Sequence, residues 1–275
     1  RSCPVACAVL RTARPGPPTA VCLNSMRIVL TNQKGGVGKT TLAFHLASLF
    51  ASDGRSVLAI DLDPQGNLTS CFLRSGVQPA NHAAVLFQGG FPEPLRVADH
   101  LDLVGADSGL GRYEDHSTSD GLYAVRTWLE RDNAHDCVIL DTPPAMGLFT
   151  RSALLAADFA LIPADVSWFA LQGLADLVAS IDKLRTTYGA RVSVLGIVLN
   201  NIQERQSFAQ ETWAELDDLY GRLLFKTTIP ESVRVRESVS QGIPVTRLDS
   251  RGKAAAAYRR LYKEMTERLE ETATT

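Results

Sequence analysis

Two lysines and two threonines within a glycine-rich stretch are the residues of this chain whose types and spacing could do chemistry. Residues 31–41 read Thr-Asn-Gln-Lys-Gly-Gly-Val-Gly-Lys-Thr-Thr. Glycines let backbone N–H groups converge on phosphate oxygens because they carry no Cβ. In such a loop Lys39 would reach the β- and γ-phosphates of a nucleotide, and the Thr40 hydroxyl would bind Mg²⁺. The stretch therefore predicts a phosphate-binding loop.

The elements on either side of this stretch must position it. The apolar run 27–30 predicts a strand, and residues 42–50 have the spacing of a helix. A strand, a glycine-rich loop and a helix in this order form the context of a P-loop, because the N-terminus of the helix adds further N–H groups for the phosphates. The residues expected to contact the nucleotide here are Lys34, Gly35, Gly36, Val37, Gly38, Lys39, Thr40 and Thr41.

Carboxylates follow two other predicted strands. Strand 56–60 runs into Asp61-Leu62-Asp63-Pro64-Gln65-Gly66-Asn67, and strand 136–140 ends in Asp141. Ligands bind at the carboxyl ends of the strands in open α/β sheets, so these carboxylates belong beside the P-loop. Asp141 has the position of a Walker B aspartate that binds Mg²⁺ directly or through water. The predicted metal site consists of Thr40, Asp63 and Asp141; an Asp-Pro turn at 63–64 and a plain strand end at 141 are the structural alternatives.

The strand pattern predicts the fold. Apolar strands alternate with helical segments, and the strands are expected at 27–30, 56–60, 101–104, 136–140, 160–163, 192–199 and 223–229. Nearly continuous apolar strands separated by helices indicate a mostly parallel sheet covered on both faces. We expect a single doubly wound α/β domain over residues 26–275, with loops and short helices in the weakly patterned stretch 75–120.

The N-terminal residues differ from the rest of the chain. Residues 1–25 contain three arginines, four prolines and no acidic residue, and Met26 is the first methionine. We interpret 1–25 as a disordered extension, with Met26 as a candidate for the native start; a signal or transit peptide is the alternative. The spacing of the five cysteines predicts neither a zinc site nor a disulfide framework, which fits a reducing cytoplasm.

The loop departs from the generic P-loop pattern in a way that resembles one family. Gln33 stands where the pattern has its first glycine, and an extra lysine, Lys34, precedes Lys39 by five residues. This form resembles the deviant Walker A loop of the ParA/MinD group of dimerising ATPases. The resemblance implies ATP and Mg²⁺ as cofactors and a homodimer when ATP is bound. It also implies that Lys34 contacts the nucleotide of the other subunit.

The same resemblance extends to further site residues. The segment 61–67 is similar to the switch I segment of that family, in which the second aspartate, here Asp63, positions the attacking water. Lys34, Lys39 and Asp63 are therefore the implied catalytic residues. In relatives the loops after strands 192–199 and 223–229 contact the adenine, which points to Asn200, Pro230 and Ser232; an asparagine cap on a following helix is the alternative for Asn200.

Residues 229–247 resemble the C-terminal signature of ParA/Soj chromosome and plasmid partition ATPases, of the small class that has no helix-turn-helix domain before its P-loop. The implied activity is slow ATP hydrolysis stimulated by a ParB-like centromere-binding partner, in the cytoplasm and associated with the nucleoid. The implied ligand of the dimer is double-stranded DNA bound without sequence preference.

Charge is consistent with a nucleic-acid surface near the C-terminus. Residues 222–263 contain ten basic and three acidic residues, although the whole chain has a formal net charge of −2. A basic surface binds duplex DNA through its phosphates. The best candidates for DNA contacts are Arg205, Arg234, Arg236 and Arg251, and the alternative is a solvated helix face. Glu231 departs from the family, which often carries a basic residue there.

Three other functions compete with DNA partition. A MinD-like membrane switch needs a basic, apolar amphipathic C-terminal helix, whereas residues 264–275 contain four glutamates and one arginine. An electron-transfer ATPase like the nitrogenase iron protein needs a cluster-bridging cysteine pair, and Cys71 and Cys137 do not match those positions. An ATPase that positions a non-DNA cargo, such as a protein cluster, stays open.

Overall fold

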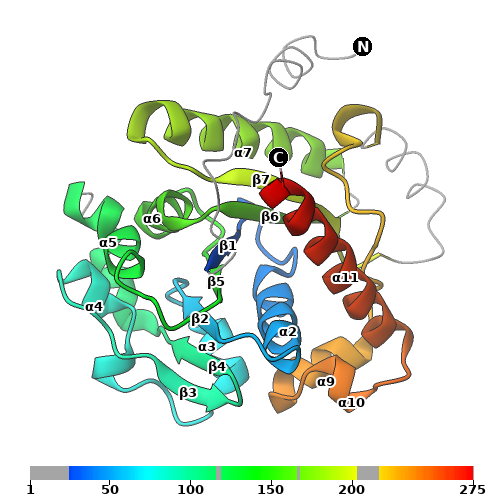
Figure 1. Cartoon of the computed structure of the whole chain (residues 1–275), viewed down its shortest axis with the longest axis horizontal. Helices are drawn as coiled ribbons and strands as arrows, with labels where there is room; N and C mark the ends of the chain where they lie inside the picture. The colour runs from blue at the N-terminus through cyan, green and yellow to red at the C-terminus, as the bar shows by residue number, and fades with distance from the viewer. Residues whose placement is uncertain (1–24, 116–118, 166–167, 203–216, 275) are drawn as a thin grey trace.

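The computed structural model describes residues 25–115, 119–165, 168–202 and 217–274 (Figure 1). The predicted extension 1–25 lies outside these residues except for its last member, and so does Arg205. Seven strands form one sheet, and in chain order they are β1 (Met26–Leu30), β2 (Val57–Asp61), β3 (Leu95–Ala98), β4 (Leu101–Val104), β5 (Cys137–Asp141), β6 (Phe159–Ala164) and β7 (Ser193–Leu199).

The strand order across the sheet is β3-β4-β2-β5-β1-β6-β7. All pairs are parallel except β3 with β4. β1 lies near the centre, between β5 and β6, so the loop after β1 opens at the point where the chain changes direction across the sheet. Such switch points hold the ligand in open α/β folds. The predicted doubly wound, mostly parallel sheet is confirmed.

Helices cover both faces of the sheet (Figure 1). The α-helices of at least six residues are α2 (Lys39–Ser52), α3 (Asn67–Phe72), α5 (Ser119–Leu129), α6 (Leu148–Ala156), α7 (Trp168–Tyr188), α9 (Val233–Gln241) and α11 (Lys253–Thr274). The other helical segments are η1 (Pro79–Asn81), α4 (Ala84–Phe87), the six-residue 3₁₀ helix η2 (Ser108–Tyr113) and α10 (Val245–Leu248).

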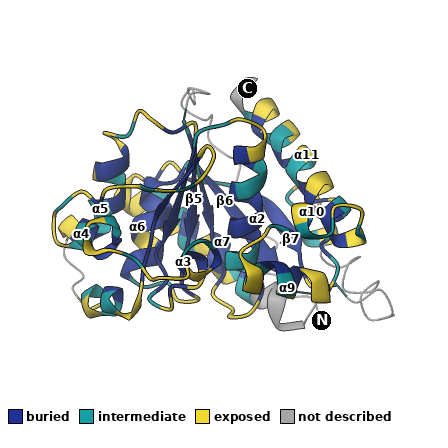
Figure 2. Cartoon of the chain, turned by 90° about the horizontal axis from the view of Figure 1, so that it is seen from below, coloured by how far each residue is buried: buried dark blue, intermediate teal, exposed yellow. Residues whose placement is uncertain are grey.

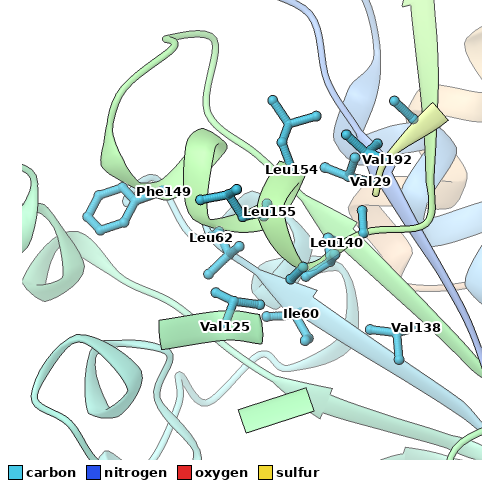
Figure 3. Packing of buried hydrophobic residues seen from close by; sticks show 14 of the residues in the cluster. Val29, Ile60, Leu62, Val125, Val138, Leu140, Phe149, Leu154, Leu155 and Val192 are labelled. Atoms are coloured by element: carbon cyan, nitrogen blue, oxygen red, sulfur yellow. The ribbon is translucent and has the colours of Figure 1, made fainter. Parts of the chain in front are cut away.

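The inner strands contribute alternate residues to two separate cores. Val29 of β1 packs with α5, α6 and α7 on one face, where Figure 3 shows it near Leu140 and Leu154. Its neighbours Ile28 and Leu30 pack with α2 and α11 on the other face. Successive side chains of a strand point to opposite faces, so only a sheet covered on both sides buries every residue of such a strand. Figure 2 shows the strands as a buried layer between helices whose outer surfaces are exposed.

One strand was not predicted. β3 pairs with β4 as a hairpin inside the stretch 75–120, for which loops, short helices and the single strand 101–104 were expected. Its residues alternate between exposed and half-buried, so it lacks the apolar run of the other strands. The turn consists of Asp99 and His100, and His100 has a φ of 60°. Hairpin turns with positive φ usually contain glycine or asparagine, and that signal is missing from this sequence.

The strand expected at 223–229 is not regular. Leu224 and Pro230 make isolated bridges to Ile197 and Ile202, but residues 226–228 are not in a strand. The N–H groups of Lys226 and Thr227 donate to the Glu264 carboxylate of α11, at 2.8 and 2.9 Å. A side chain from a distant helix therefore takes the amides that a neighbouring strand would otherwise use.

Candidate active site

The glycine-rich loop joins the end of β1 to the start of α2. Gly38 caps the helix with a φ of 89°, and Gly36 has a φ of 76°. Both are left-handed conformations that other L-residues rarely adopt. A Cβ on Gly38 would overlap with Nδ2 of Asn200. Position 38 therefore requires glycine both for its backbone conformation and for its neighbour.

Asn200 braces this loop from the end of β7. Its Nδ2 donates to the carbonyl of Val37 at 2.8 Å, and the residue is only 3 % exposed. The amide expected to read adenine thus holds the P-loop in the described structure. Asn200 still lies on the cleft wall, beside Asn201.

Lys39 lies under the loop. Its ammonium donates to the carbonyls of Asn32 at 3.2 Å and Lys34 at 3.3 Å. Burial lowers the pKa of Lys39, and the negative charges of Asp141 and Asp63 oppose this shift. The lysine is therefore held where a polyphosphate in the loop would lie within its reach, with its charge supported by two carboxylates.

Thr40 and Asp141 form the pair expected for a metal site. The Thr40 hydroxyl donates to Asp141 Oδ2 at 2.7 Å. Asp141 is fully buried at the end of β5, and its Oδ1 has no hydrogen-bond partner among the described residues. Burial raises the pKa of Asp141 well above the ordinary range, and the charge of Asp61 adds to the rise. A buried carboxylate oxygen without a partner beside a hydroxyl is a donor set that fits Mg²⁺, which takes oxygen ligands and keeps its other positions for water and phosphate.

Asp61 and Asp63 follow β2 and have different surroundings. Asp61 is fully buried and accepts hydrogen bonds from the N–H of Asp63 and from both the N–H and the hydroxyl of Thr69. Burial raises its pKa, and these hydrogen bonds oppose the shift. Asp63 accepts from the N–H of Gln65 through Oδ1 at 2.9 Å and lines the cleft. Asp61 therefore supports the loop, whereas Asp63 faces the space where substrate would bind.

Lys34 lies at the surface of the loop. Its ammonium is 2.5 Å from Oδ2 of Asp165, at the end of β6, and its side chain is 43 % exposed. An exposed lysine on the rim of a phosphate loop can reach a second molecule, which Lys39 cannot do.

A cleft of about 720 Å³ runs from the P-loop to α9. Ten predicted site residues line it, namely Gly35, Gly36, Gly38, Lys39, Thr40, Thr41, Asp63, Asn200, Pro230 and Ser232. Lys34, Val37 and Asp141 adjoin it through the contacts above or through the loop itself. The site predicted from five separate segments is thus brought together in one place.

Several lining residues were not predicted to belong to the nucleotide site. From α3 and the segment before it come Gln65, Asn67, Ser70 and Cys71, and from α9 come Val235, Arg236, Val239 and Ser240. The run 61–67 contained a signal for the first group, because it continues the carboxylate segment. The second group has no local signal, since α9 meets the P-loop only through tertiary packing.

The arginines proposed for DNA contacts lie on two nearby surfaces. Arg234 and Arg236 are exposed on α9 and pair with Glu237 and Glu231, at 2.8 and 3.1 Å. Arg236 also lines the nucleotide cleft. Arg251 borders a second cleft, of about 340 Å³, together with Lys253 and Arg260. The DNA contacts of these arginines therefore stay a prediction. Arg236 lies in the wall of the nucleotide cleft as well as on the surface proposed for DNA.

Comparison with known proteins identifies the family. The family model described as an AAA domain matches residues 25–194. The chromosome-partitioning ATPase Soj of Thermus thermophilus is 38 % identical over 256 residues, which cover 89 % of this chain and 97 % of that protein. The chromosome partitioning protein ParA of Caulobacter vibrioides is 32 % identical, with 89 % and 96 % covered. This chain belongs to the ParA/Soj family of P-loop ATPases.

Solved structures agree with the ParA/Soj fold. The ATP complex of a McdA variant from Cyanothece superposes with a TM-score of 0.80 at 24 % identity, covering 90 % of this chain and 97 % of that one. Cobyrinic acid a,c-diamide synthase from Mycobacterium smegmatis, with an ATP analogue and magnesium, gives 0.73 at 25 % identity, with 86 % and 93 % covered. Within the part of this ParA/Soj chain that is described, no helix is long and apolar enough to cross a membrane.

Proposed function

We propose that this ParA/Soj protein is an ATP-driven switch that binds DNA without sequence preference and positions chromosome or plasmid DNA with a ParB-like partner. The observation that supports this function best is that one helix, α9, forms part of two surfaces. α9 lines the nucleotide cleft with Arg236 and Val239, and it exposes Arg234 to solvent. A change in the cleft can therefore reach a basic surface without a long chain of intermediate contacts.

Each residue of the cleft has a separate role in the proposed reaction. The loop N–H groups and Lys39 bind the phosphates of ATP, and Thr40 with Asp141 would hold Mg²⁺, which neutralises charge on the phosphates. Asp63 orients the attacking water. Lys34 lies at the exposed surface of the loop and would add positive charge from the second subunit, the part that an arginine finger plays in other P-loop enzymes. Because full catalysis then needs two subunits, hydrolysis is slow in the isolated protein and increases when the ParB-like partner binds.

DNA binding depends on the two copies of the basic surface that a dimer presents. One protomer offers Arg234 and Arg251 on an otherwise nearly neutral protein. Phosphate contacts of this number are weak at physiological salt, because counterions compete with them. A dimer places two such surfaces on one duplex, and the second contact becomes intramolecular. Hydrolysis separates the dimer and releases the DNA, so the protein works on the nucleoid in the cytoplasm.

The test is DNA affinity as a function of nucleotide. Fluorescence anisotropy with several unrelated duplexes should detect binding with Mg-ATP, most strongly for Asp63→Ala, and little binding with ADP. Arg234→Glu with Arg251→Glu should weaken binding about tenfold or more, because several phosphate contacts per dimer are lost. Arg236 is left unchanged because it lines the nucleotide cleft. Lys183→Glu is the matched control, since Lys183 is exposed on α7 over the other face of the sheet.

Equal DNA affinity with ATP and ADP, or an equal loss in the Lys183 control, would contradict the proposal. It would instead favour a second function, an ATPase that positions a non-DNA cargo. The pairing of Arg234 with Glu237 and of Arg236 with Glu231 supports this second function, because both acidic partners reduce the positive charge available for DNA.

A further inference from the structure

His45 lies on the P-loop helix, one turn beyond the residues of the motif. It is fully buried, and it follows Thr41 by four positions, so both residues lie on one face of α2. Thr41 lines the nucleotide cleft, whereas His45 lies behind it. The nucleotide chemistry described above uses no histidine.

The contacts of the ring determine which nitrogen carries the proton. Nδ1 lies 2.7 Å from the carbonyl oxygen of Thr41, which can only accept, so Nδ1 donates. Nε2 is then free to accept, and the N–H of Val245 donates to it at 3.1 Å. Burial lowers the pKa of His45 to about 4, which keeps the ring in this neutral form. The side chain thus joins the backbone of α2 to the first residue of α10.

The same nitrogen also reaches α9. The buried Ser238 hydroxyl lies 3.1 Å from Nε2 and 2.8 Å from the carbonyl oxygen of Val235, so these two acceptors share its one proton. Val235 and Val239, on either side of Ser238 in sequence, line the nucleotide cleft. Tyr258 of α11 stacks on the imidazole with ring centroids 4.2 Å apart, so the ring cannot swing away from α9. One side chain therefore connects the P-loop helix with the helix that forms the opposite wall of the cleft.

We propose that His45 is a positioning residue that holds α9, one wall of the nucleotide cleft, against the P-loop helix. α9 is a nine-residue helix, and the buried contacts of His45 with Ser238 and with Val245, just beyond the helix, connect it to the P-loop helix. A nucleotide that fills the cleft contacts both walls, and His45 transmits its presence to α9 and to the arginines on that helix. The inference rests on the nucleotide cleft proposed above.

Two substitutions of His45 test the contacts of Nδ1 and of Nε2 separately. The amide of asparagine at position 45 can replace Nδ1 but is too short to reach Val245 and Ser238. The longer glutamine can place its carbonyl oxygen near Nε2 and accept from Val245. His45→Asn is therefore expected to weaken the binding of Mg-AMPPNP about tenfold, the cost of a buried donor left without its partner, and His45→Gln should restore affinity to within about twofold.

Hydrogen exchange at saturating Mg-AMPPNP separates positioning from simple stability. In the wild type the analogue should slow exchange both in residues 34–44 and in residues 233–248. In His45→Asn it should still protect 34–44 but no longer 233–248, and His45→Gln should regain both. Tyr258→Phe is the control, because it keeps the stacked ring and removes a buried hydroxyl that has no partner among the described residues; it should behave as the wild type.

The exchange results distinguish failure of the role of His45 from failure of the nucleotide cleft. Protection of 233–248 in His45→Asn equal to that of the wild type, or equal loss of protection in both segments, overturns the role of His45. A wild type in which the analogue protects neither segment overturns the nucleotide cleft itself. Should His45→Asn fail to fold, Ser238→Ala makes the same comparison, because it leaves the ring in place and removes its contact with α9.

Discussion

We propose that Lys39 and Asp63 act on the substrate with different chemistry, so their substitution should separate binding from hydrolysis. Lys39→Ala removes a buried cation held under the phosphate loop, so ATP affinity should fall about tenfold or more. Asp63→Ala leaves the loop intact and removes the carboxylate that we propose orients water, so affinity should stay within about threefold while kcat falls about a hundredfold or more. Calorimetric titration with AMPPNP and a steady-state phosphate assay measure the two effects.

The control for this pair is Asp115→Ala, an exposed aspartate outside the cleft. It should change neither affinity nor kcat. If Asp63→Ala hydrolyses ATP at the wild-type rate, the water-orienting role assigned to Asp63 is wrong.

Two buried histidines should give opposite dependences of stability on pH. The pKa of His45 is lowered to about 4 in the folded protein, so between pH 6.5 and 4 the unfolded chain binds more protons and stability falls as pH falls. From pH 7 to pH 5 this costs about 2 kcal/mol of the free energy of unfolding. Urea unfolding of the wild type and of His45→Gln should show a smaller acid loss in the variant.

His135 opposes this trend. Burial alone would lower its pKa, but hydrogen bonds to Asp132 and Asp102 raise it above the ordinary value. Its contribution is complete at low pH and is lost as the pH rises through the folded pKa. His135→Gln should therefore destabilise the protein more at pH 5 than at pH 8. An equal effect at both pH values would contradict the assignment of a charged His135.

At this scale the sequence predicted the residues that belong to a motif and missed those that act through tertiary contact. The structure brings Lys39, Thr40, Asp63 and Asp141 together beside the carboxyl ends of the strands, where a phosphate site requires such residue types, and their chemical roles stay predictions. The bracing of the P-loop by Asn200 depends on a contact between residues 163 positions apart. No local spacing encodes such a contact.

At the scale of elements, burial made the strands predictable. β1, β2, β5 and β6 are fully or almost fully buried on both faces, so their sequences are continuous apolar runs. β3 lies at the edge and is half exposed, and the segment 223–229 is diverted by Glu264. Both cases depend on neighbours that the local pattern does not describe.

Gly242 provides a test of how α9 is fixed. It ends the helix with a φ of 67°, and a Cβ there would lie 2.7 Å from the carbonyl oxygen of Cys71, at the other side of the cleft. Gly54 has a similar φ of 83° but open space around it. Gly54→Ala should therefore cost about 1 kcal/mol of backbone strain, and Gly242→Ala distinctly more, because the clash is with backbone that cannot rotate away.

Urea unfolding measures both costs, and AMPPNP affinity adds a second readout. Gly242→Ala should also weaken AMPPNP binding, because it pushes α9 away from α3, whereas Gly54→Ala should leave binding unchanged. Equal losses of stability in the two variants would mean that the contact with Cys71 does not hold α9.

The whole molecule brings together parts of the chain that lie far apart in sequence. His45 and Val245 are 200 positions apart, and Lys34 and Asp165 are 131 apart, yet both pairs lie around the P-loop. Overall composition predicted a single α/β domain but not this arrangement. The net charge is near neutral although the C-terminal region is basic. Two arginines of α9 in that region pair with glutamates of α9 or of the loop before it.

In the proposed dimer, Lys34 would exchange one contact for another. In the protomer its ammonium lies 2.5 Å from Asp165, and the two side chains are 43 % and 34 % exposed. To reach the nucleotide of a second subunit, Lys34 must leave Asp165. Exposed ion pairs contribute at most about 1 kcal/mol, so this exchange is inexpensive compared with contact to a triphosphate.

Substitutions of Lys34 and of Asp165 should therefore change the stability of the dimer in opposite directions. Lys34→Ala should prevent dimerisation in Mg-AMPPNP without loss of nucleotide binding by the protomer, because Lys39 and the loop remain. Asp165→Asn should strengthen the dimer by up to about fivefold, since it weakens the competing contact. Sedimentation velocity over a range of protein concentrations measures both, with Lys183→Ala as a control for a lost surface charge. A Lys34→Ala protein that dimerises like the wild type would show that Lys34 serves its own loop, and the site would then be complete within one subunit.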